Sequence, residues 1–226
     1  MPNPYENPEL RRICGGALRP GGLELTREAL DLCSFSPGAR ILDLGCGPGA
    51  TLGLLRASGF KALGVDLSLG LLEEAREQGA VLRADFRRLP LRDAFADGLF
   101  CECSLSLAED KSAALDEFSR VLKAGGLLVL SDLFIDRPEE EPGPRTCLAG
   151  AVSEEKMLLL LERAGFRLLH RRDCGQALKT LAARLIWEFE VAALPETAPR
   201  LCRRGPERAG KASPKTACLL LIAGRA

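Results

Sequence analysis

A carboxylate followed by a glycine-rich run, DLGCGPG at residues 43–49, is the feature of this sequence best suited to binding a ligand. Glycines in such a run allow a tight turn and let a ligand approach the backbone closely. A carboxylate at the mouth of that turn would repel a pyrophosphate and attract an ammonium or sulfonium group. We therefore expect a positively charged ligand to lie against Asp43, Leu44, Gly45, Cys46, Gly47 and Gly49.

The same glycines leave one alternative open. Residues 45–50 (GCGPGA) also satisfy the glycine pattern of dinucleotide-binding turns. Asp66 follows Gly45 by about 20 residues, where such turns have an acid that binds the ribose. A dinucleotide-dependent oxidoreductase is therefore an alternative, against which Asp43 weighs.

A second carboxylate stands at Asp66, followed by Leu67 and Ser68. Asp66 is placed to accept charge-assisted hydrogen bonds from two ribose hydroxyl groups. Leu67 could pack on one face of an adenine ring, and Ser68 is a suitable N-cap for the helix that comes next. These three residues are expected to bind the nucleoside part of the ligand.

Two later positions complete the expected site. Asp85 can accept a hydrogen bond from an adenine amino group, while the backbone N–H of Phe86 donates to a ring nitrogen. The backbone of Cys103 and Ser104 would border the other end of the ligand.

Strand and helix patterns alternate from about residue 40 onward, which predicts an α/β fold with a mostly parallel sheet and helices on both faces. Each acid or glycine above lies in the last residues of an expected strand or just after it. Ligands bind beyond the carboxyl ends of such strands. The expected strands are 40–45, 61–66, 80–84, 97–103, 127–131, 166–172 and 216–223. The expected helices are 51–58, 68–78, 112–123, 153–164 and 176–194.

Four segments (ILDLGCGPG, GVDLS, ADFRRLPL and DEFSRVLKAGGLLVLSD) resemble class I S-adenosylmethionine-dependent methyltransferases, particularly the ubiquinone, menaquinone and arsenite methyltransferase branch. The resemblance implies a Rossmann-like sheet of seven strands, the last one antiparallel. It implies S-adenosylmethionine as cofactor and a small-molecule methyl acceptor, which the sequence does not identify. The chain then forms one domain: an N-terminal cap (1–38), a cofactor-binding core (39–175), a helical and basic insertion (176–215) and the last strand (216–226).

A finer resemblance concerns residues 146–151 (TCLAGA), which are similar to the stretch of arsenite methyltransferases that carries one arsenic-binding cysteine. It implies that Cys147 binds trivalent arsenic, whose softness matches a thiolate. An arsenite methyltransferase-like enzyme is thus an alternative. A module that binds the cofactor without catalysis is another.

The N-terminal segment is expected to cover the cofactor, with Tyr5 and Arg11 facing the acceptor pocket. No residue stands out as a catalytic base. The CxC pair at Cys101 and Cys103 lacks further ligands at metal-site spacing, so no metal is expected.

Composition indicates which kinds of partner and which cell compartment to expect. The chain has 31 basic and 31 acidic residues, which offers no electrostatic reason to bind nucleic acid. No apolar run approaches the ~20 residues of a membrane span. Nine cysteines without an export signal indicate thiols in a reducing cytoplasm. The usage of Arg, Ala, Leu and Gly favours a bacterial source, and the oligomeric state is left open.

Overall fold

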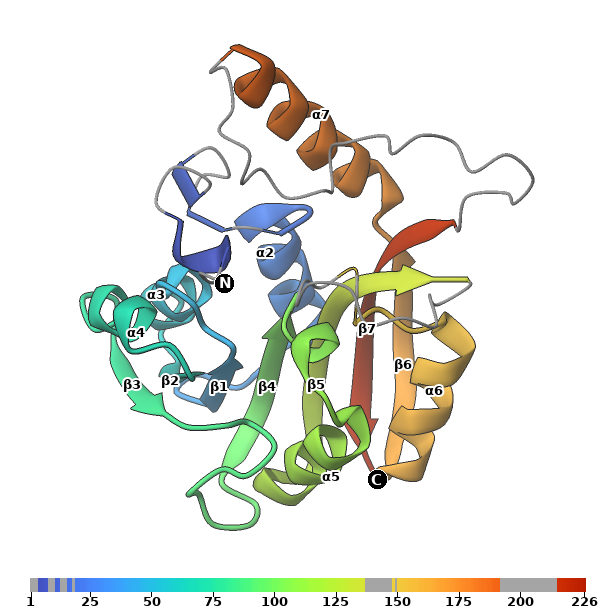
Figure 1. Ribbon diagram of the computed structural model, residues 1–226. Coiled ribbons are helices and arrows are strands. Elements are labelled where there is room, and N and C mark those ends of the chain that lie inside the picture. The colour runs from blue at the N-terminus through green and yellow to red at the C-terminus, as the bar shows by residue number, and fades with distance from the viewer. Residues whose placement is uncertain are drawn as a thin grey trace.

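A computed structural model describes residues 4–7, 11–12, 16–17, 19–136, 148, 150–191 and 215–226. Its seven strands form one sheet in the order β3-β2-β1-β4-β5-β7-β6 (Figure 1). The strands are β1 (Arg40–Leu44), β2 (Lys61–Asp66), β3 (Ala80–Arg83), β4 (Ala96–Glu102), β5 (Leu122–Ile135), β6 (Phe166–Asp173) and β7 (Thr216–Arg225).

The direction of the strands confirms the predicted sheet. β1 pairs in parallel with β2 and β4, and β4 pairs in parallel with β5. β7 is antiparallel to both β5 and β6, so it is the reversed strand inserted beside the fifth. The chain adds β2 and β3 on one side of β1 and all later strands on the other side, so the switch in strand order lies between β1 and β4.

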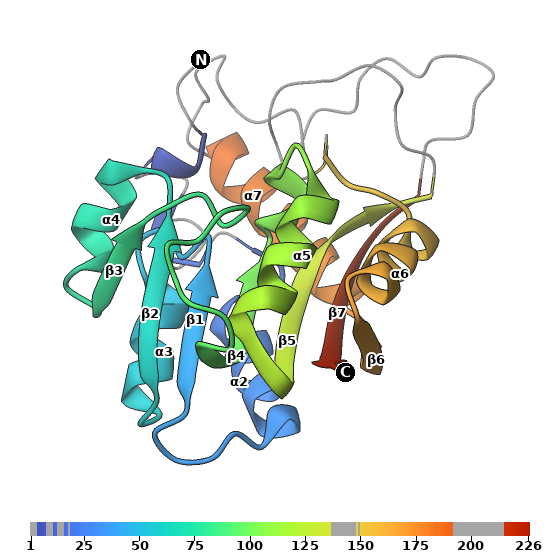
Figure 2. The same ribbon diagram turned by 90° about the horizontal axis from the view of Figure 1, so that it is seen from below.

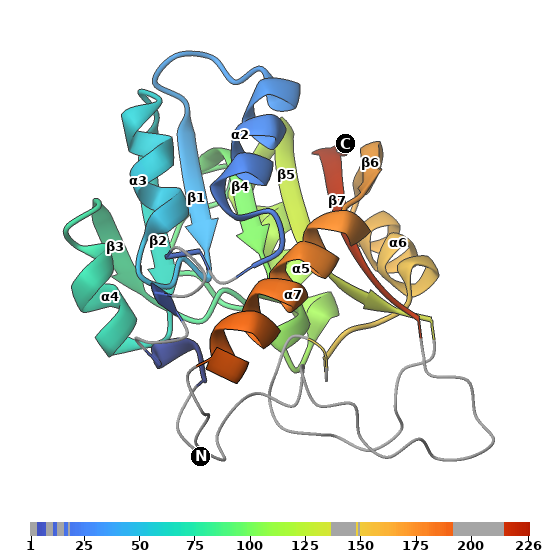
Figure 3. The same cartoon turned by 90° about the horizontal axis from the view of Figure 1, so that it is seen from above.

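Helices cover both faces of the sheet, as Figure 2 shows for α5 and α6 on one side and α2 and α3 on the other. The helical elements are η1 (Pro4–Glu6), α2 (Gly22–Cys33), α3 (Ala50–Ala57), α4 (Leu69–Ala75), η2 (Leu105–Leu107), α5 (Lys111–Val121), α6 (Glu154–Arg163) and α7 (Gly175–Val191). Figure 3 shows α7 on the same side of the sheet as α2, extending beyond the carboxyl ends of the strands. No helix among the described residues is long and apolar enough to cross a membrane.

Two helices begin at the predicted caps. The Ser68 hydroxyl accepts a hydrogen bond from the Leu71 backbone N–H, and the Ser153 hydroxyl accepts one from Lys156. Each satisfies a backbone donor that the first helical turn leaves without a partner.

The boundary between α5 and β5 differs from the prediction. Helix α5 ends at Val121, and Leu122 is already extended, buried and paired with Ala96 of β4. Gly125, at φ 72°, lies inside the strand, where the register between β4 and β5 shifts. The glycine pair therefore forms an irregularity within β5 instead of ending the helix, because burial of Leu122 favours early pairing.

The end of β4 also differs. The sequence predicts a strand to residue 103 with Cys101 and Cys103 on one face, but the strand ends at Glu102. Cys103 has a φ of 50°, in the left-handed region, so the alternation of side chains stops before it.

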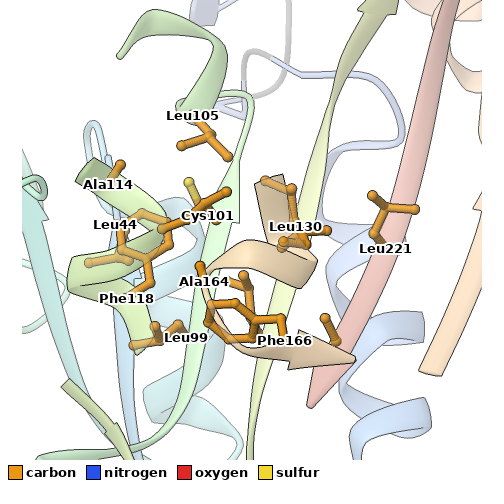
Figure 4. Packing of buried hydrophobic residues seen from close by; sticks show 14 of the residues in the cluster. Leu44, Leu99, Cys101, Leu105, Ala114, Phe118, Leu130, Ala164, Phe166 and Leu221 are labelled. Carbon is orange, nitrogen blue, oxygen red and sulfur yellow. The ribbon is translucent and has the colours of Figure 1, made fainter. Parts of the chain in front are cut away.

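The hydrophobic core lies on both faces of the sheet. One cluster joins the strands to α5 and α6, and its packing is seen in Figure 4. Phe118 of α5 is fully buried there, and its ring meets that of Phe86 edge to face at 5.7 Å between centroids. The other cluster joins the strands to α2 and α3. These layers hold the carboxyl ends of β1, β2 and β4 in fixed positions.

We predict that Phe118→Ala lowers the free energy of unfolding by about 3–5 kcal/mol, because it removes a fully buried ring and leaves a cavity. Urea denaturation followed by circular dichroism measures this. Leu159→Ala is the control, since Leu159 of α6 is 45% exposed and its loss should change stability by less than about 1 kcal/mol. Equal effects of the two substitutions would contradict this description of the core.

Candidate functional site

The backbone amides of the glycine turn are already paired within the protein. The N–H groups of Gly45 and Cys46 both donate to the Val65 carbonyl, at 2.8 and 3.0 Å. The N–H of Gly47 donates to Asp66 Oδ2 at 2.9 Å, and that of Gly49 donates to the Cys46 carbonyl at 3.0 Å. Pro48 has no N–H, so no amide from residue 45 to 49 remains to bind a pyrophosphate.

Gly45 is required by both conformation and space. It has a φ of 73°, and a Cβ there would lie 2.5 Å from the Cβ of Ser104. The Ser104 hydroxyl donates to the Leu44 carbonyl at 2.8 Å, and both residues are buried. Ser104 therefore joins the end of β1 to the end of β4 through its side chain, in addition to any backbone contact with a ligand.

Gly49 and Cys46 pack the turn against α4 and β2. Gly49 has a φ of 91°, and a Cβ there would lie 3.0 Å from the Cα of Ala75 in α4. The Cys46 side chain is buried beneath the turn against Gly64 and Leu72, and burial raises the pKa of its thiol. Only the backbone of Cys46 is thus available to the face of the turn.

Asp66 is held at the end of β2 by two backbone amides. Its Oδ2 accepts from Gly47 and its Oδ1 accepts from Ser68, each at 2.9 Å. A carboxylate has about four acceptor positions, so two remain for hydroxyl groups of a ligand. Leu67, the residue between, is 59% exposed, which leaves an apolar surface beside the carboxylate.

Asp43 lies beneath the turn and not at its mouth, where the sequence placed it. Its side chain is 3% exposed, and the Leu52 backbone N–H donates to it. Its Oδ2 has no hydrogen-bond partner. Burial and the nearby Glu102 raise the pKa of this carboxyl to about 8, against the opposing effect of Arg19. The site therefore contains a buried acid that a cationic ligand would stabilise in its charged form.

A buried polar cluster next to Asp43 was missed by the sequence analysis. Arg19 approaches Glu102 Oε2 to within 3.0 Å, and its guanidinium also donates to Thr26 and Thr51 at 2.7 Å each. The two threonine hydroxyls donate to the two oxygens of Glu102 at 2.8 and 2.7 Å. Arg19 Nε is buried and has no partner.

The cluster brings together residues from four parts of the chain. Arg19 comes from the N-terminal cap, Thr26 from α2, Thr51 from α3 and Glu102 from the end of β4. The available signal was Glu102, a single acid within the apolar run LFCEC. A buried acid in a strand requires a partner, and here that partner is a cap arginine.

The N-terminal cap contacts the β2–α4 region directly. Ser68 donates to Glu6 Oε1 at 2.7 Å, and Arg11 pairs with Glu74 of α4 at 2.6 Å. Arg11 is thus held against α4, and its predicted place facing the acceptor pocket stays a prediction. Tyr5 packs against the apolar cluster that includes α2 and β7.

Asp85 is already paired in the structure. The Arg87 side chain forms a bidentate ion pair with it, at 2.6 Å for the closest oxygen, and the Arg87 backbone N–H donates to Oδ1. Arg87 holds the pKa of Asp85 below its usual range. Phe86 packs against Phe118, with its ring edge near Gly45. Asp85 has acceptor positions left for an adenine amino group, but its negative charge is already paired with the positive charge of Arg87.

The segment that follows β4 is held against the end of β5. The Cys103 N–H donates to the Ser131 carbonyl at 2.7 Å, and Cys103 is buried. Asp132 is fully buried and accepts from the Ser106 N–H at 2.8 Å, which fixes η2 after β4. Burial raises the pKa of Asp132 to about 6. Its two oxygens accept from the backbone N–H groups of Ser106 and Leu133, so Asp132 positions the backbone here.

Two predictions cannot be placed. Cys147, and most of the basic part of the insertion, lie outside the described residues. Among the residues that the structure does describe, no group of three metal-ligating side chains comes together.

Known proteins that are similar to this chain include methyltransferases. The profile of a family described as a methyltransferase domain matches residues 42–130. An O-methyltransferase of Pyrenophora dematioidea is 30% identical over 173 residues, which cover 70% of this chain and 65% of that protein. An arsenite methyltransferase of Halobacterium salinarum is 31% identical over 150 residues, 59% of this chain and 38% of that protein. The chain thus spans less than two thirds of these relatives.

The fold is shared with solved structures. The [4+2]-cyclase SpnF superposes with a TM-score of 0.77 at 19% identity, over 98% of this chain and 92% of that one. SpnF is named for a cyclisation and not for methyl transfer, so the fold alone does not determine the reaction.

We predict that Asp43→Asn stabilises the protein without ligand at pH 7.5 by at least about 1 kcal/mol, since each pKa unit corresponds to about 1.4 kcal/mol. The pKa of Asp43 is raised from 3.8 to about 8, so the folded wild type binds a proton that the unfolded chain has lost. The contribution of Asp43 to the stability of the wild type therefore falls as pH rises between about 4 and 8.

Urea denaturation of both proteins at several pH values between 4 and 9 measures this. The difference in stability should be small at pH 4, grow toward pH 8 and then level off. A difference that does not change with pH would show that Asp43 is ionised normally in the fold.

Proposed function

Because the chain belongs to the class I S-adenosylmethionine-dependent methyltransferase family, we propose that it transfers the methyl group of S-adenosylmethionine to a small-molecule acceptor. The observation that carries the proposal is the glycine turn, whose amides are occupied by protein acceptors, one of them the carboxylate of Asp66. The buried acid Asp43 lies beneath it. Such a turn favours a cationic nucleoside over a phosphorylated one.

The nucleoside part of the cofactor fits the end of β2. The two remaining acceptor positions of Asp66 suit the two ribose hydroxyls, and its backbone bonds hold the carboxylate in one orientation. The exposed Leu67 offers an apolar surface to the adenine ring. Asp85, Phe86 and the β4 end at residues 103–104 complete the predicted contacts.

The amino-acid part of the cofactor fits the buried cluster. It carries a carboxylate and an ammonium, and two buried atoms lack hydrogen-bond partners here: Arg19 Nε and Asp43 Oδ2. Arg19 would hold the carboxylate, and Asp43 with Glu102 would favour the ammonium. A buried polar atom without a partner is costly, so this pair indicates a bound group.

The cofactor supplies a methyl group already activated on a sulfonium. The protein then has to align the acceptor in line with that bond and exclude water. The N-terminal cap contributes by covering the site through Glu6, Arg11 and Arg19. No catalytic base is assigned, because a thiolate, an activated carbon or arsenic(III) can accept a methyl group without one.

An arsenite-type acceptor is the second candidate. The relative from Halobacterium supports it, and Cys103 lies at the end of β4 beside the site. A methyl-transfer assay with labelled cofactor should therefore include arsenite with thiols among its acceptors. Failure of label to reach any acceptor from a broad panel, despite tight cofactor binding, would favour the non-catalytic module.

We also place the protein in the bacterial cytoplasm. Six cysteines among the described residues are thiols and not disulfides, which supports a reducing compartment.

We predict that Asp66→Ala weakens binding of S-adenosylhomocysteine by about 1.5–3 kcal/mol, the usual scale for hydrogen bonds to a charged group. Isothermal titration calorimetry measures the affinity. Asp116→Asn is the matched control, since it removes an exposed acid on α5 and should leave binding unchanged. If Asp66→Ala binds as tightly as the control, Asp66 does not hold the ribose.

A second binding prediction separates the two ends of the cofactor. Arg19→Met should weaken S-adenosylhomocysteine by about 1.5–3 kcal/mol but leave 5′-methylthioadenosine, which lacks the amino-acid group, nearly unchanged. The comparison within one variant removes effects of altered folding. Equal losses for both ligands would mean that Arg19 only supports the structure.

A further inference from the structure

Two cysteines lie opposite each other where β6 ends and α7 begins. The register of β6 and β7 pairs Asp173 with Leu219, so the next pair outward is Cys174 and Cys218. The Cys174 N–H donates to the Cys218 carbonyl at 2.7 Å. Residues at such a hydrogen-bonded antiparallel position have Cα atoms about 5.5 Å apart, within the range of disulfides.

The two side chains are in contact and buried. A side-chain hydrogen bond links the two thiols, and the Cys174 thiol also donates to the Arg172 carbonyl at 3.9 Å. Both cysteines belong to the apolar cluster between the sheet and α2. Formation of a bond between them would therefore require little movement of the chain.

The surroundings shift the pKa values of the two thiols in opposite directions. Hydrogen bonding from Cys218, together with the positive charge of Arg172, lowers the pKa of Cys174. The same hydrogen bond, together with burial, raises the pKa of Cys218. A thiolate is the reactive form of cysteine, so Cys174 is the nucleophile and Cys218 the resolving thiol.

From this geometry we infer that Cys174 and Cys218 are a redox modification site, which a peroxide converts to a disulfide at the base of α7. The Cys174 thiolate attacks one peroxide oxygen and becomes a sulfenic acid, releasing hydroxide. Cys218 then attacks that sulfur, the S–S bond forms, and the sulfenic oxygen leaves with the Cys218 proton as water. The proton that Cys174 lost on ionising converts the hydroxide to a second water. Two electrons pass from the thiols to the peroxide.

The disulfide would act on α7, which starts at Gly175 directly after Cys174. The Leu178 N–H donates to the Cys174 carbonyl, so the first helical turn is built on this cysteine. Figure 3 shows the rest of α7 extending past the carboxyl ends of the strands. The disulfide would fix the base of this helix to β7 and slow its opening.

The test is oxidation of the full chain with a small excess of hydrogen peroxide, followed by alkylation, proteolysis and mass spectrometry without reduction. We expect a peptide joining Cys174 to Cys218, lighter by two hydrogens, which disappears with dithiothreitol. Cys218→Ser should instead accumulate a sulfenic acid at Cys174 that dimedone traps, and Cys174→Ser should give neither product.

Cys33→Ser is the matched control, because Cys33 of α2 belongs to the same cluster and burial raises its pKa to about 12. It should form the Cys174–Cys218 link as the wild type does. Hydrogen exchange should be slower in residues 175–188 of the oxidised wild type, with no change in that segment for oxidised Cys174→Ser. Oxidised protein without the joined peptide, or with the link but unchanged exchange in α7, would overturn the inference.

Discussion

The hydrogen bond between the Gly47 amide and the Asp66 carboxylate is the interaction on which the site depends. It joins the turn after β1 to the end of β2, and it uses the amide that a dinucleotide-binding turn would offer to a phosphate. The other amides of the turn bond to the Val65 and Cys46 carbonyls. The turn is thereby shaped without a ligand, and the carboxylate that remains beside it is that of Asp66. This single arrangement explains why a fold shared by many α/β proteins is here suited to a cationic nucleoside.

A second constraint comes from the buried charges around Glu102. Two threonines and an arginine from three separate segments converge on this acid. Because unpaired charges inside a protein are costly, the cluster holds α2, α3 and the N-terminal cap against β4. The same cluster leaves Arg19 Nε and Asp43 Oδ2 without partners. The cluster that holds the cap in place thus also contains the two atoms to which we assign the amino-acid group of the cofactor.

The sequence predicted the architecture well because its signals were local or carried by the resemblance. Glycines, serine caps and short apolar runs indicated the strands, their alternation with helices and the placement of acids at strand ends. The features it could not predict depend on contacts between distant residues. Arg19 in a loop resembles any solvated arginine, yet it meets Glu102 of β4. Asp43 was expected at the mouth of the glycine turn, but its side chain is buried and accepts from the Leu52 N–H of α3. The pairing of Leu122 with Ala96 likewise decided where β5 begins, against the local effect of two glycines.

A turn whose amides are satisfied by the protein should select a nucleoside without phosphates. Calorimetric titration of the same protein sample with S-adenosylhomocysteine and with ADP-ribose tests this most directly, because both ligands contain adenosine and only one carries a pyrophosphate on it. The structure predicts clear binding of S-adenosylhomocysteine and none detectable for ADP-ribose at the same concentrations. ADP-ribose binding as tightly as S-adenosylhomocysteine would contradict it.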